Sequence, residues 1–431
     1  MKKLSALPLH WLILMGMLAG IIFGIAAVAL GWHQFTADWI KPWGIIFINL
    51  LKLIAIPLIV VSLISGISGL GDVSSLSRIG LKTISFYLIT TVVAVSTGLA
   101  IANIISPGHF LSPEKSAEFQ ARFAQSAAVQ QDIQRGPLQF VVDLVPENIF
   151  TALSQNSRML QVIFFAVLFG LALIRVGNGK AKPIKELFSG LNDVVMQMIH
   201  MIMYVAPLGV FALMAGIITD VAGHNPADTI TLFASLGMYA LTVIIGLLLL
   251  IFAFYPVLIH FFTRLKYKQF LRGIAPAQLL AFSTSSSAAT LPMTMQCCEE
   301  NLKVKNEVAS FVLPLGATVN MDGTSLYQAV AAVFLAQIYG MDLTFAQQLT
   351  IILTATLASI GSAAVPGAGM IMLVIVLGAV GIPAEGIALI FAVDRPLDML
   401  RTVVNITGDS SVACIVATTE NKMKPEPDHH E

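Results

Sequence analysis

The chain alternates long apolar segments with short polar ones. Eight apolar segments are long enough to cross a membrane as helices, and they lie near residues 10–31, 43–70, 80–106, 144–174, 187–219, 229–262, 304–340 and 386–418. The first apolar run continues to about Leu30, so we interpret it as a retained helix rather than a cleaved signal peptide. The pattern predicts an all-α polytopic membrane protein with eight transmembrane helices.

Two further apolar stretches, near 270–297 and 346–380, are interrupted in the middle by small residues and a proline. The first contains SSAATLP at 286–292, and the second contains GSAAVPG at 361–367. Such a pair is typical of inverted repeats whose broken helices meet near the middle of the membrane. We therefore predict two re-entrant helical hairpins. The alternative interpretation is a pair of continuous helices that pack closely through small residues.

The charges between the segments predict the orientation of the chain. The basic residues that indicate cytoplasmic connections are Lys2, Lys3, Arg78, Lys82, Arg175, Lys180, Lys182, Lys185, Arg264, Lys266, Lys268, Arg272, Lys303, Lys305, Lys422 and Lys424. The connections at 220–228 and 341–345 contain none. We therefore expect a multi-pass protein of the cell or inner membrane with both termini cytoplasmic and the polar loop at about 107–140 outside. Three tryptophans that would form an interfacial belt flank the first external loop: Trp32, Trp39 and Trp43.

The composition supports a membrane location and excludes other classes of protein. Hydrophobic residues make up 57% of the chain and charged residues 11%, where soluble domains carry about 25% charged residues. The net charge is zero and there is no basic run, so we expect no nucleic-acid partner. Cys297, Cys298 and Cys414 have neither metal-ligand nor disulfide spacing, and the histidines form no zinc motif. We expect no cofactor.

The last apolar segment contains the polar run DRPLDMLRTVVNITGD at 394–409. Charged residues inside a membrane cost about 2.5–3.5 kcal/mol each, so they persist only when they pair with each other or with a ligand. At about 100° per residue, one helical face collects most of the run. That face contains Asp394, Asp398, Arg401, Thr402, Asn405 and Asp409, with Arg395 at its edge. This polar stripe is the predicted site of function.

A second polar run, GATVNMDGT at 316–324, interrupts another apolar segment. Gly316 and Gly323 bracket Asn320 and Asp322, so an unwound turn there would present carbonyl, amide and carboxylate oxygens together. Hard monovalent cations prefer such an all-oxygen environment. The alternative is a buried Asp322 that caps a kinked helix. The third segment adds a phenol and two hydroxyls, which are those of Tyr87, Thr90 and Thr91.

These residues predict a transport site rather than a catalytic one. Arg401 offers a guanidinium fork for a substrate carboxylate, and Asp398 offers a counter-charge for a substrate ammonium. Asp322 and Asp409 would neutralise bound cations. No hydrolytic or redox centre is evident, so we do not expect an enzyme.

With these motifs in this order, the chain resembles the glutamate transporter family, which carries acidic and neutral amino acids and dicarboxylates. The resemblance covers nearly the whole chain and includes the serine-rich first hairpin, NMDGT, the VPGAG of the second hairpin and the DxxxDMxRTxxNxxGD run. It implies a sodium-coupled bacterial or archaeal glutamate/aspartate transporter. It also implies a homotrimer, in which a scaffold holds the subunits together and a mobile domain carries substrate by an elevator motion, with the hairpins as gates.

The resemblance also implies a division of the chain. The expected parts are scaffold helices 1–2 at 1–79, helix 3 at 80–106, an external loop with scaffold helices 4–5 at 107–225, helix 6 at 226–266, hairpin 1 at 267–300, helix 7 at 301–341, hairpin 2 at 342–382, helix 8 at 383–420 and a cytoplasmic tail at 421–431. Helices 3, 6, 7 and 8 and both hairpins would form the mobile transport domain.

By the same resemblance, each ligand has an expected set of residues. The substrate site would comprise Ser286, Ser287, Thr324, Val365, Gly369, Asp398, Arg401, Thr402 and Asn405. The sodium sites would comprise Tyr87, Thr90, Thr91, Gly316, Thr318, Asn320, Asp322, Ser359, Ile360, Ser362, Asn405 and Asp409. Neutral amino acid carriers lack the match to Arg401, and pure dicarboxylate carriers lack the match to Asp398. An acidic amino acid, L-aspartate or L-glutamate, is therefore the expected substrate.

The coupling ion and two departures follow from the same comparison. Asp409 and Met321 are of the sodium-coupled type, and Gln328 replaces a glutamate that animal relatives use for proton coupling, so we expect sodium symport. Ser285 and Met399 stand where archaeal and animal members, respectively, carry an arginine. The additional arginine of this chain is Arg395, about one turn from the expected site.

Other functions remain open at this stage. Within the same fold, a proton-coupled glutamate carrier or a cystine carrier would also use Arg401. An intramembrane aspartyl protease could pair Asp322 with Asp409, although it would need neither Arg401 nor two hairpins. A passive channel is the remaining alternative, and accumulation against a gradient would exclude it.

Overall fold

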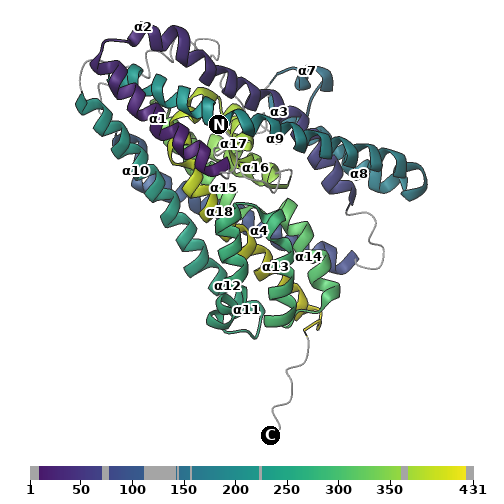
Figure 1. Ribbon diagram of the computed structural model, residues 1–431. Coiled ribbons are helices and arrows are strands. Elements are labelled where there is room, and N and C mark those ends of the chain that lie inside the picture. The colour runs from purple at the N-terminus through teal and green to yellow at the C-terminus, as the bar shows by residue number, and fades with distance from the viewer. Residues whose placement is uncertain are drawn as a thin grey trace, which may run out of the picture.

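The computed structural model describes residues 9–69, 77–110, 142, 145–155, 158–222, 226–360 and 367–423 (Figure 1). About 89% of the structure is helical and the described residues contain no strand, only one isolated bridge between Val304 and Met423. The predicted all-α class is therefore confirmed. Most of the predicted external loop lies outside the described residues.

One group of helices occupies the upper part of Figure 1. Its main members pack chiefly against each other, and they are α1 (Leu9–Ala29), α3 (Lys41–Gly69), α8 (Met159–Val176) and α9 (Asn178–Ala222). The short elements α2 (His33–Phe35), η2 (Thr36–Ile40) and α7 (Ile149–Leu153) complete it. Gly16 and Gly20 allow α1 to lie against α9, because a Cβ at either position would collide with the α9 backbone. We name these helices the first group.

The remaining helices form a second group with its own buried core. They are α4 (Ser77–Ile105), η4 (Pro107–Phe110), α10 (Pro226–Leu249), η6 (Leu250–Phe254), α11 (Tyr255–Phe262), α12 (Tyr267–Thr284), α13 (Ser287–Gln296), η7 (Cys297–Asn301), α14 (Asn306–Val319), α15 (Asp322–Ile338), α16 (Phe345–Ile360), α17 (Ala368–Ala379), η8 (Ala384–Gly386) and α18 (Ile387–Thr419). Helix α15 is central, because it packs against α4, α10, α16, α17 and α18, and nearly all of its residues are buried.

Three breaks interrupt the helices of the second group. The predicted unwound turn lies between α14 and α15, where Asn320 has an extended backbone at φ −113° and ψ 91°. Between α12 and α13, Ser285 is left-handed at φ 51° and Ser286 caps α13 by accepting a hydrogen bond from the Ala289 amide at 3.2 Å. Between α16 and α17, residues 361–366 lie outside the described residues, and Gly367 follows them with φ +81°.

The observed helices differ from the predicted segments in two places. The apolar segment predicted near 144–174 is not one helix, because α7 ends at Leu153 and α8 begins at Met159 after a polar stretch. Helix α9 is 45 residues long and extends the segment predicted near 187–219 in both directions.

Among the described residues, four helical stretches are long and apolar enough to span a membrane: His33–Ser65, Arg78–Phe110, Gly179–Gly216 and Phe233–Phe262. Eight spans and two re-entrant hairpins remain predictions.

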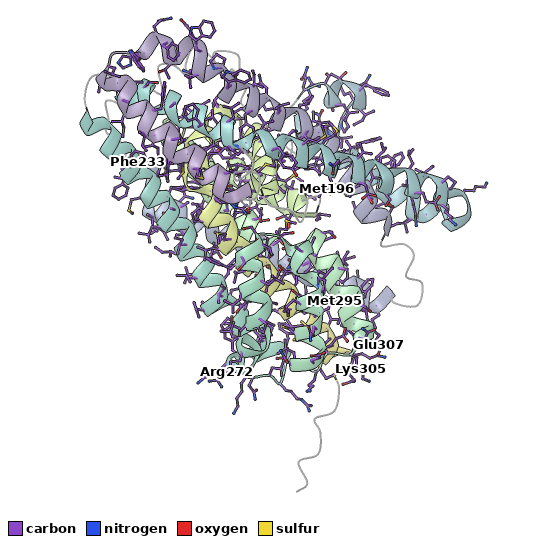
Figure 2. The ribbon with its side chains drawn as sticks, viewed as in Figure 1. Met196, Phe233, Arg272, Met295, Lys305 and Glu307 are labelled. Atoms are coloured by element: carbon purple, nitrogen blue, oxygen red, sulfur yellow. The ribbon has the colours of Figure 1, made fainter. Side chains whose placement is uncertain are left out.

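Several charged connections gather at one end of the second group. Figure 2 shows Arg272, Lys305 and Glu307 there, whereas Phe233 of α10 lies toward the other end of the second group. Lys422 pairs with Glu307 at 2.7 Å, and just beyond α18, Glu420 accepts a hydrogen bond from Lys82 and lies 3.3 Å from Arg78. These charged connections lie near one another, and their side of the membrane remains a prediction.

The Glu420 contacts predict a pH-dependent contribution to stability. The hydrogen bond from Lys82 and the neighbouring positive charges lower the pKa of Glu420 below the ordinary value of 4.5. A lowered carboxyl pKa stabilises the fold above the ordinary value, and this stabilisation disappears as the pH falls through the lowered pKa. We expect Glu420→Gln to destabilise the protein by about 0.5–1 kcal/mol at pH 7 and by less near pH 3. Thermal melting in detergent at both pH values measures this difference.

The matched control for this prediction is Glu186→Gln. Glu186 is exposed and lies 3.9 Å from Lys182 on the same helix, so its substitution should leave the melting temperature unchanged at both pH values. An equal loss of stability at pH 7 and pH 3 in the Glu420 variant would contradict the electrostatic explanation.

Candidate functional site

The polar stripe of α18 faces the interior of the second group, as predicted. All six of its members are buried: Asp394, Asp398, Arg401, Thr402, Asn405 and Asp409. Two separate clusters of polar side chains form along it. We name Asp394, Arg395, Asp398 and Arg401 the arginine cluster. We name Thr90, Thr91, Tyr255, Asn320, Asp322 and Asp409 the aspartate cluster; about two helical turns separate Arg401 from Asp409 along α18.

Arg401 is the centre of the arginine cluster and is fully buried. Its Nη2 donates to Asp394 Oδ1 at 2.8 Å and to Asp398 Oδ1 at 3.0 Å. The guanidinium carbon lies 3.8 Å from the centroid of the Tyr327 ring, which adds a cation–π contact. A buried charge is tolerated only when it is paired in this way, so the two carboxylates hold the guanidinium inside the protein.

The same guanidinium retains donors for a ligand. Nε and Nη1 of Arg401 are buried and have no hydrogen-bond partner among the described residues. Gly369 of α17 lies beside them, because a Cβ at that position would be 3.0 Å from Nη1. These donors point along different edges of the guanidinium, and an anionic oxygen such as that of a carboxylate is a suitable acceptor for either.

Asp398 is saturated by protein donors. Its Oδ1 accepts from Arg401, and its Oδ2 accepts from the Gly367 amide at 3.1 Å and from Arg395 Nη1 at 3.2 Å. Asp398 therefore links α18 to the start of α17. The Thr402 hydroxyl donates to the Asp398 carbonyl at 2.8 Å, so in this structure it bonds within its own helix.

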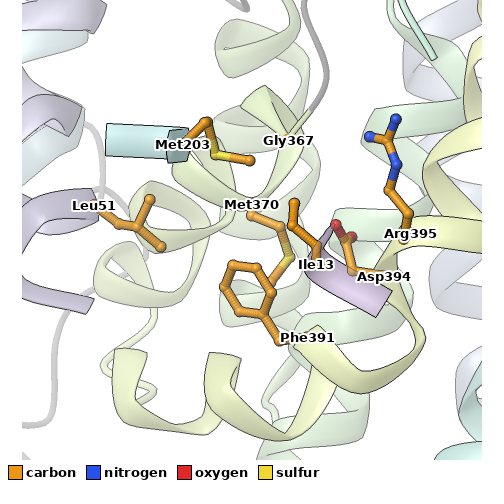
Figure 3. Close-up of a pocket in the computed structure, with 8 residues that line it drawn as sticks. All are labelled: Ile13, Leu51, Met203, Gly367, Met370, Phe391, Asp394 and Arg395. Atoms are coloured by element: carbon orange, nitrogen blue, oxygen red, sulfur yellow. The ribbon is translucent and has the colours of Figure 1, made fainter. Parts of the chain in front are cut away.

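A small pocket adjoins the arginine cluster at the boundary between the two groups of helices (Figure 3). Ile13, Leu51 and Met203 line it from the first group. Gly367, Met370, Phe391, Asp394 and Arg395 line it from the second group. The arginine cluster thus lies at a surface where the two groups meet.

Asp322 organises the aspartate cluster from the first position of α15. Its Oδ1 accepts from Thr91 at 2.9 Å and from Thr90 at 3.3 Å, and its Oδ2 accepts from Tyr255 at 2.8 Å. The Thr90 hydroxyl also lies 3.1 Å from Asn320 Oδ1. The broken helix therefore brings a carboxylate, an amide and hydroxyls together, as the sequence predicted.

Asn320 joins the two carboxylates of this cluster by donating its Nδ2 to Asp409 Oδ1 at 2.9 Å. Asp322 and Asp409 are buried, and no Lys, Arg or His among the described residues forms an ion pair with either. Their partners are neutral hydroxyls and amides. Buried carboxylates without a cationic partner suit a hard cation with oxygen ligands.

The end of α14 lies directly against this cluster. A Cβ at Gly316 would be 2.6 Å from Asp409 Oδ1, so only glycine allows the helix to approach the carboxylate this closely. Tyr87 is buried beside it, with its hydroxyl donating to the Val312 carbonyl at 2.9 Å. In this structure Tyr87 thus bonds to α14 rather than to Asp322.

Three further predicted residues, Ser359, Thr324 and Asn405, form hydrogen bonds around the break between α14 and α15. The Ser359 hydroxyl accepts from the Met321 amide at 2.8 Å and donates to the Val319 carbonyl at 3.1 Å. Asn405 accepts from the Gly323 amide at 2.8 Å and donates to the Thr324 hydroxyl at 3.2 Å. Asn405 thus fixes α18 to the first turn of α15, between the arginine cluster and Asp409.

Some predicted residues are not brought into either cluster. Thr318 is exposed, and its hydroxyl donates to the Leu315 carbonyl at 3.0 Å. Ile360 is half-buried at the end of α16, and Ser286 and Ser287 are buried at the turn between α12 and α13. Two members, Ser362 and Val365, lie outside the described residues.

The structure also adds residues that the sequence interpretation did not assign to a site. Tyr255 donates to Asp322 but is an isolated tyrosine in an apolar segment, so its sequence carried no signal. Asp394 belongs to the predicted stripe but to neither the expected substrate set nor the expected sodium set, and in the structure it accepts a hydrogen bond from Arg401 Nη2. Gln328 lies beside the second broken stretch, with its amide 3.3 Å from the Gly369 carbonyl.

Comparison with known proteins places this site in a family of transporters. The family model of the sodium:dicarboxylate symporter family matches residues 9–419. The chain is 35% identical over 422 residues to the proton/glutamate-aspartate symporter of Escherichia coli, covering 96% of this chain and 93% of the relative. It is 34% identical over 420 residues to the proton/sodium-glutamate symport protein of Bacillus subtilis, with the same coverage. It is 36% identical over 462 residues to human excitatory amino acid transporter 2, covering 96% and 79%. The chain belongs to the sodium:dicarboxylate symporter family.

Proposed function

We propose that this protein is a secondary active transporter that carries L-aspartate or L-glutamate into the cell together with sodium. The observation that carries the proposal is the composition of the α18 stripe. One level of the stripe holds a buried guanidinium with unused donors, and the other holds buried carboxylates without a cationic partner among the described residues. The first suits an anionic substrate, and the second suits a coupling cation.

The substrate would bind at the arginine cluster. Its side-chain carboxylate would accept from an unused donor of Arg401, and its ammonium would bind Asp398 in place of one of the protein donors that this carboxylate has in the structure. Asp394 would keep Arg401 in position, because it holds Nη2 at 2.8 Å. The rest of the proposed site is the predicted set Ser286, Ser287, Thr324, Val365, Gly369, Thr402 and Asn405.

Sodium would bind around the aspartate cluster as a co-transported substrate. Its binding would neutralise Asp322 and Asp409 and stabilise the oxygen-rich break between α14 and α15. Asn405 offers a physical connection to the other cluster, because it bonds to both Gly323 and Thr324 at the start of α15. Sodium binding at the break would therefore favour the arrangement of α18 and α15 that receives the amino acid.

The packing supports an elevator mechanism. The first group of helices would be the fixed scaffold, in a homotrimer, and the second group would be the mobile transport domain. The two groups meet where α17 and α18 contact α1, α3 and α9. Alternating access would follow from movement along this boundary in a cell or inner membrane, with both termini cytoplasmic.

Proton coupling is the second candidate. The Escherichia coli relative is named a proton symporter and the Bacillus subtilis relative a proton/sodium symporter. A buried carboxylate that has no cationic partner, such as Asp322 or Asp409, could be neutralised by binding a proton rather than by a sodium ion bound next to it.

Radiolabelled L-aspartate and L-glutamate uptake into proteoliposomes distinguishes the candidates. Accumulation driven by a sodium gradient alone supports the proposal, and accumulation driven only by a proton gradient refutes sodium coupling.

Substitution of Arg401 tests the substrate assignment. We expect Arg401→Cys to reduce L-aspartate and L-glutamate uptake at least about 30-fold, because truncating one partner of a buried ion pair costs about 2–5 kcal/mol. Neutral amino acids should retain or gain uptake, since they need no guanidinium. Uptake in proteoliposomes, normalised to correctly folded protein by gel filtration, measures both. Undiminished uptake of acidic substrates would refute the role of Arg401.

Substitution of Asp409 tests the ion assignment. Removing one negative charge beside a bound cation weakens attraction by about 1–4 kcal/mol at a partly screened site. We therefore expect Asp409→Asn to raise the half-saturating sodium concentration for uptake at least about fivefold. The matched control is Asp342→Asn, which removes an exposed carboxylate outside both clusters. A sodium dependence equal to that of the control would refute the assignment.

An ion pair across the boundary tests the elevator motion. Lys52 of α3 lies 2.7 Å from Glu385, which precedes α18, so the pair joins the two groups of helices. Movement of one group along the other would break it. We expect Lys52→Glu to change the transport rate up to about fivefold without changing substrate affinity, because an exposed pair contributes about 0.2–1 kcal/mol.

The charge-reversed double variant, Lys52→Glu with Glu385→Lys, should restore the rate. Lys182→Glu serves as the control, since Lys182 lies on one helix of the first group. A rate that falls further in the double variant would contradict a pair that forms and breaks during transport.

A further inference from the structure

The two carboxylate oxygens of Asp322 have different partners. The Tyr255 hydroxyl donates to Oδ2 at 2.8 Å and is the only donor to this oxygen among the described residues. The hydroxyls of Thr91 and Thr90 donate to the other oxygen, Oδ1, at 2.9 Å and 3.3 Å. Tyr255 is fully buried, so its contact is shielded from solvent. The phenol therefore determines which oxygen of Asp322 faces the threonines.

On the Oδ1 side, oxygen atoms outnumber the hydrogens that can bind them. The Thr90 hydroxyl lies 3.1 Å from Asn320 Oδ1 and 3.3 Å from Asp322 Oδ1. It also lies 3.1 Å from the Tyr87 carbonyl of its own helix. A hydroxyl has one hydrogen and cannot satisfy three acceptors, whereas a hard cation binds several oxygens at once. The threonine side of Asp322 therefore suits a cation, and the Oδ2 side is already occupied by a donor.

A glycine on α18 makes room for the contact between Tyr255 and Asp322. A Cβ at Gly408 would lie 2.8 Å from the Tyr255 hydroxyl and 3.0 Å from Asp322 Oδ2. A methyl group there would have to displace at least one of the two. The Tyr255 hydroxyl also lies 3.5 Å from the Val404 carbonyl, one turn earlier on α18. The phenol is thus held between the carboxylate and the backbone of α18.

The helix that carries Tyr255 is distorted just before it. Residues Leu250–Phe254 form the π-helical turn η6, in which the Tyr255 amide donates to the carbonyl five positions earlier. Such a turn has one residue more than an α-helical turn, so it rotates Tyr255 by about 100° relative to an unbroken helix. Pro256 has no amide hydrogen, and the carbonyl five positions before it, that of Ile251, accepts from the Tyr267 hydroxyl instead. The distortion is therefore supported by the chain and fixes the direction of the phenol.

We propose that Tyr255 is a positioning residue for the coupling ion: it holds Oδ2 of Asp322, so that Oδ1 stays fixed on the threonine side, and it thereby makes the site select sodium over the smaller lithium ion. This inference rests on the proposed function, because sodium coupling is part of that function. Removing a hydrogen-bond partner that orients a ligating carboxylate typically weakens metal binding about 10–100-fold. Selectivity between hard cations depends on the size and flexibility of the cavity, and a carboxylate that can rotate closes around a smaller ion more easily.

The variant Tyr255→Phe tests this role, because it removes the hydroxyl and keeps the ring. Ion binding is measured without transport, as the rise in melting temperature of the purified protein in detergent when sodium or lithium chloride replaces choline chloride. For the unchanged protein, we expect a lower half-saturating concentration for sodium than for lithium. In the variant we expect the sodium value to rise at least about tenfold and the lithium value to rise less, so that the preference for sodium falls at least about threefold. The KM for L-aspartate uptake at saturating sodium should stay the same, since the arginine cluster is unchanged.

A second variant and a control separate positioning from a packing defect. Gly408→Ala keeps the hydroxyl but displaces it, so it should reduce the preference for sodium in the same direction, and it gives the same test if Tyr255→Phe does not fold. In the double variant, Gly408→Ala should add less than it does alone, because both substitutions break one contact. Tyr204→Phe removes the hydroxyl of an exposed tyrosine in the first group and should change neither ion concentration. Gel filtration of each variant establishes that it is folded.

The outcomes distinguish this inference from the proposed function. If a sodium gradient drives L-aspartate accumulation in the unchanged protein, but Tyr255→Phe binds both ions as the control does, the inference is wrong and the proposed function stands. If the variant raises the sodium and lithium values by the same factor, Tyr255 does not set the selectivity, and the inference is again wrong. If a sodium gradient drives no accumulation in the unchanged protein, the proposed sodium coupling is wrong and this inference is refuted with it.

Discussion

The need to pair buried charges constrains most of this structure. Arg401 has no exposure to solvent, so its guanidinium depends on Asp394 and Asp398 of its own helix. This requirement fixes the rotation of α18, because all three residues must lie on the face covered by α15 and α17. Asp398 then extends the constraint to α17 through the Gly367 amide. One set of ion pairs thus positions the last helix and the start of α17 together.

The aspartate cluster solves the same problem with neutral dipoles instead of cations. Asp322 takes three hydroxyl donors from α4 and α11, and Asp409 takes an amide from Asn320. These contacts need the helix to break at Asn320 and Met321, since a continuous helix would turn the two side chains to different faces. Glycine at 316 lets the end of α14 reach Asp409. The two clusters therefore differ in the sign of the ligand that each one suits.

The boundary between the two groups of helices differs in its contacts from the two buried clusters. Glycines bring α1 close to α9 within the first group, where they favour a rigid unit. Across the boundary, the contacts include the Lys52–Glu385 pair at the protein surface and the apolar residues around the pocket. Surface pairs and apolar contacts can be exchanged at low cost, whereas the buried ion pairs of α18 cannot. Any relative movement is therefore expected at the boundary and not within the clusters.

The sequence by itself determined the all-α class, the polar stripe of α18 and the break near Asn320, because each depends on periodicity or local composition. Helical spacing alone placed Asp394, Asp398 and Arg401 on one face. The tertiary structure decided which of those residues bind one another, since that depends on neighbouring helices. Tyr255 joined the cluster because α11 packs against α18, which brings its hydroxyl to Asp322, and nothing in its local sequence required this. The contact of Arg395 with Asp398 likewise depends on side-chain conformations that spacing leaves open.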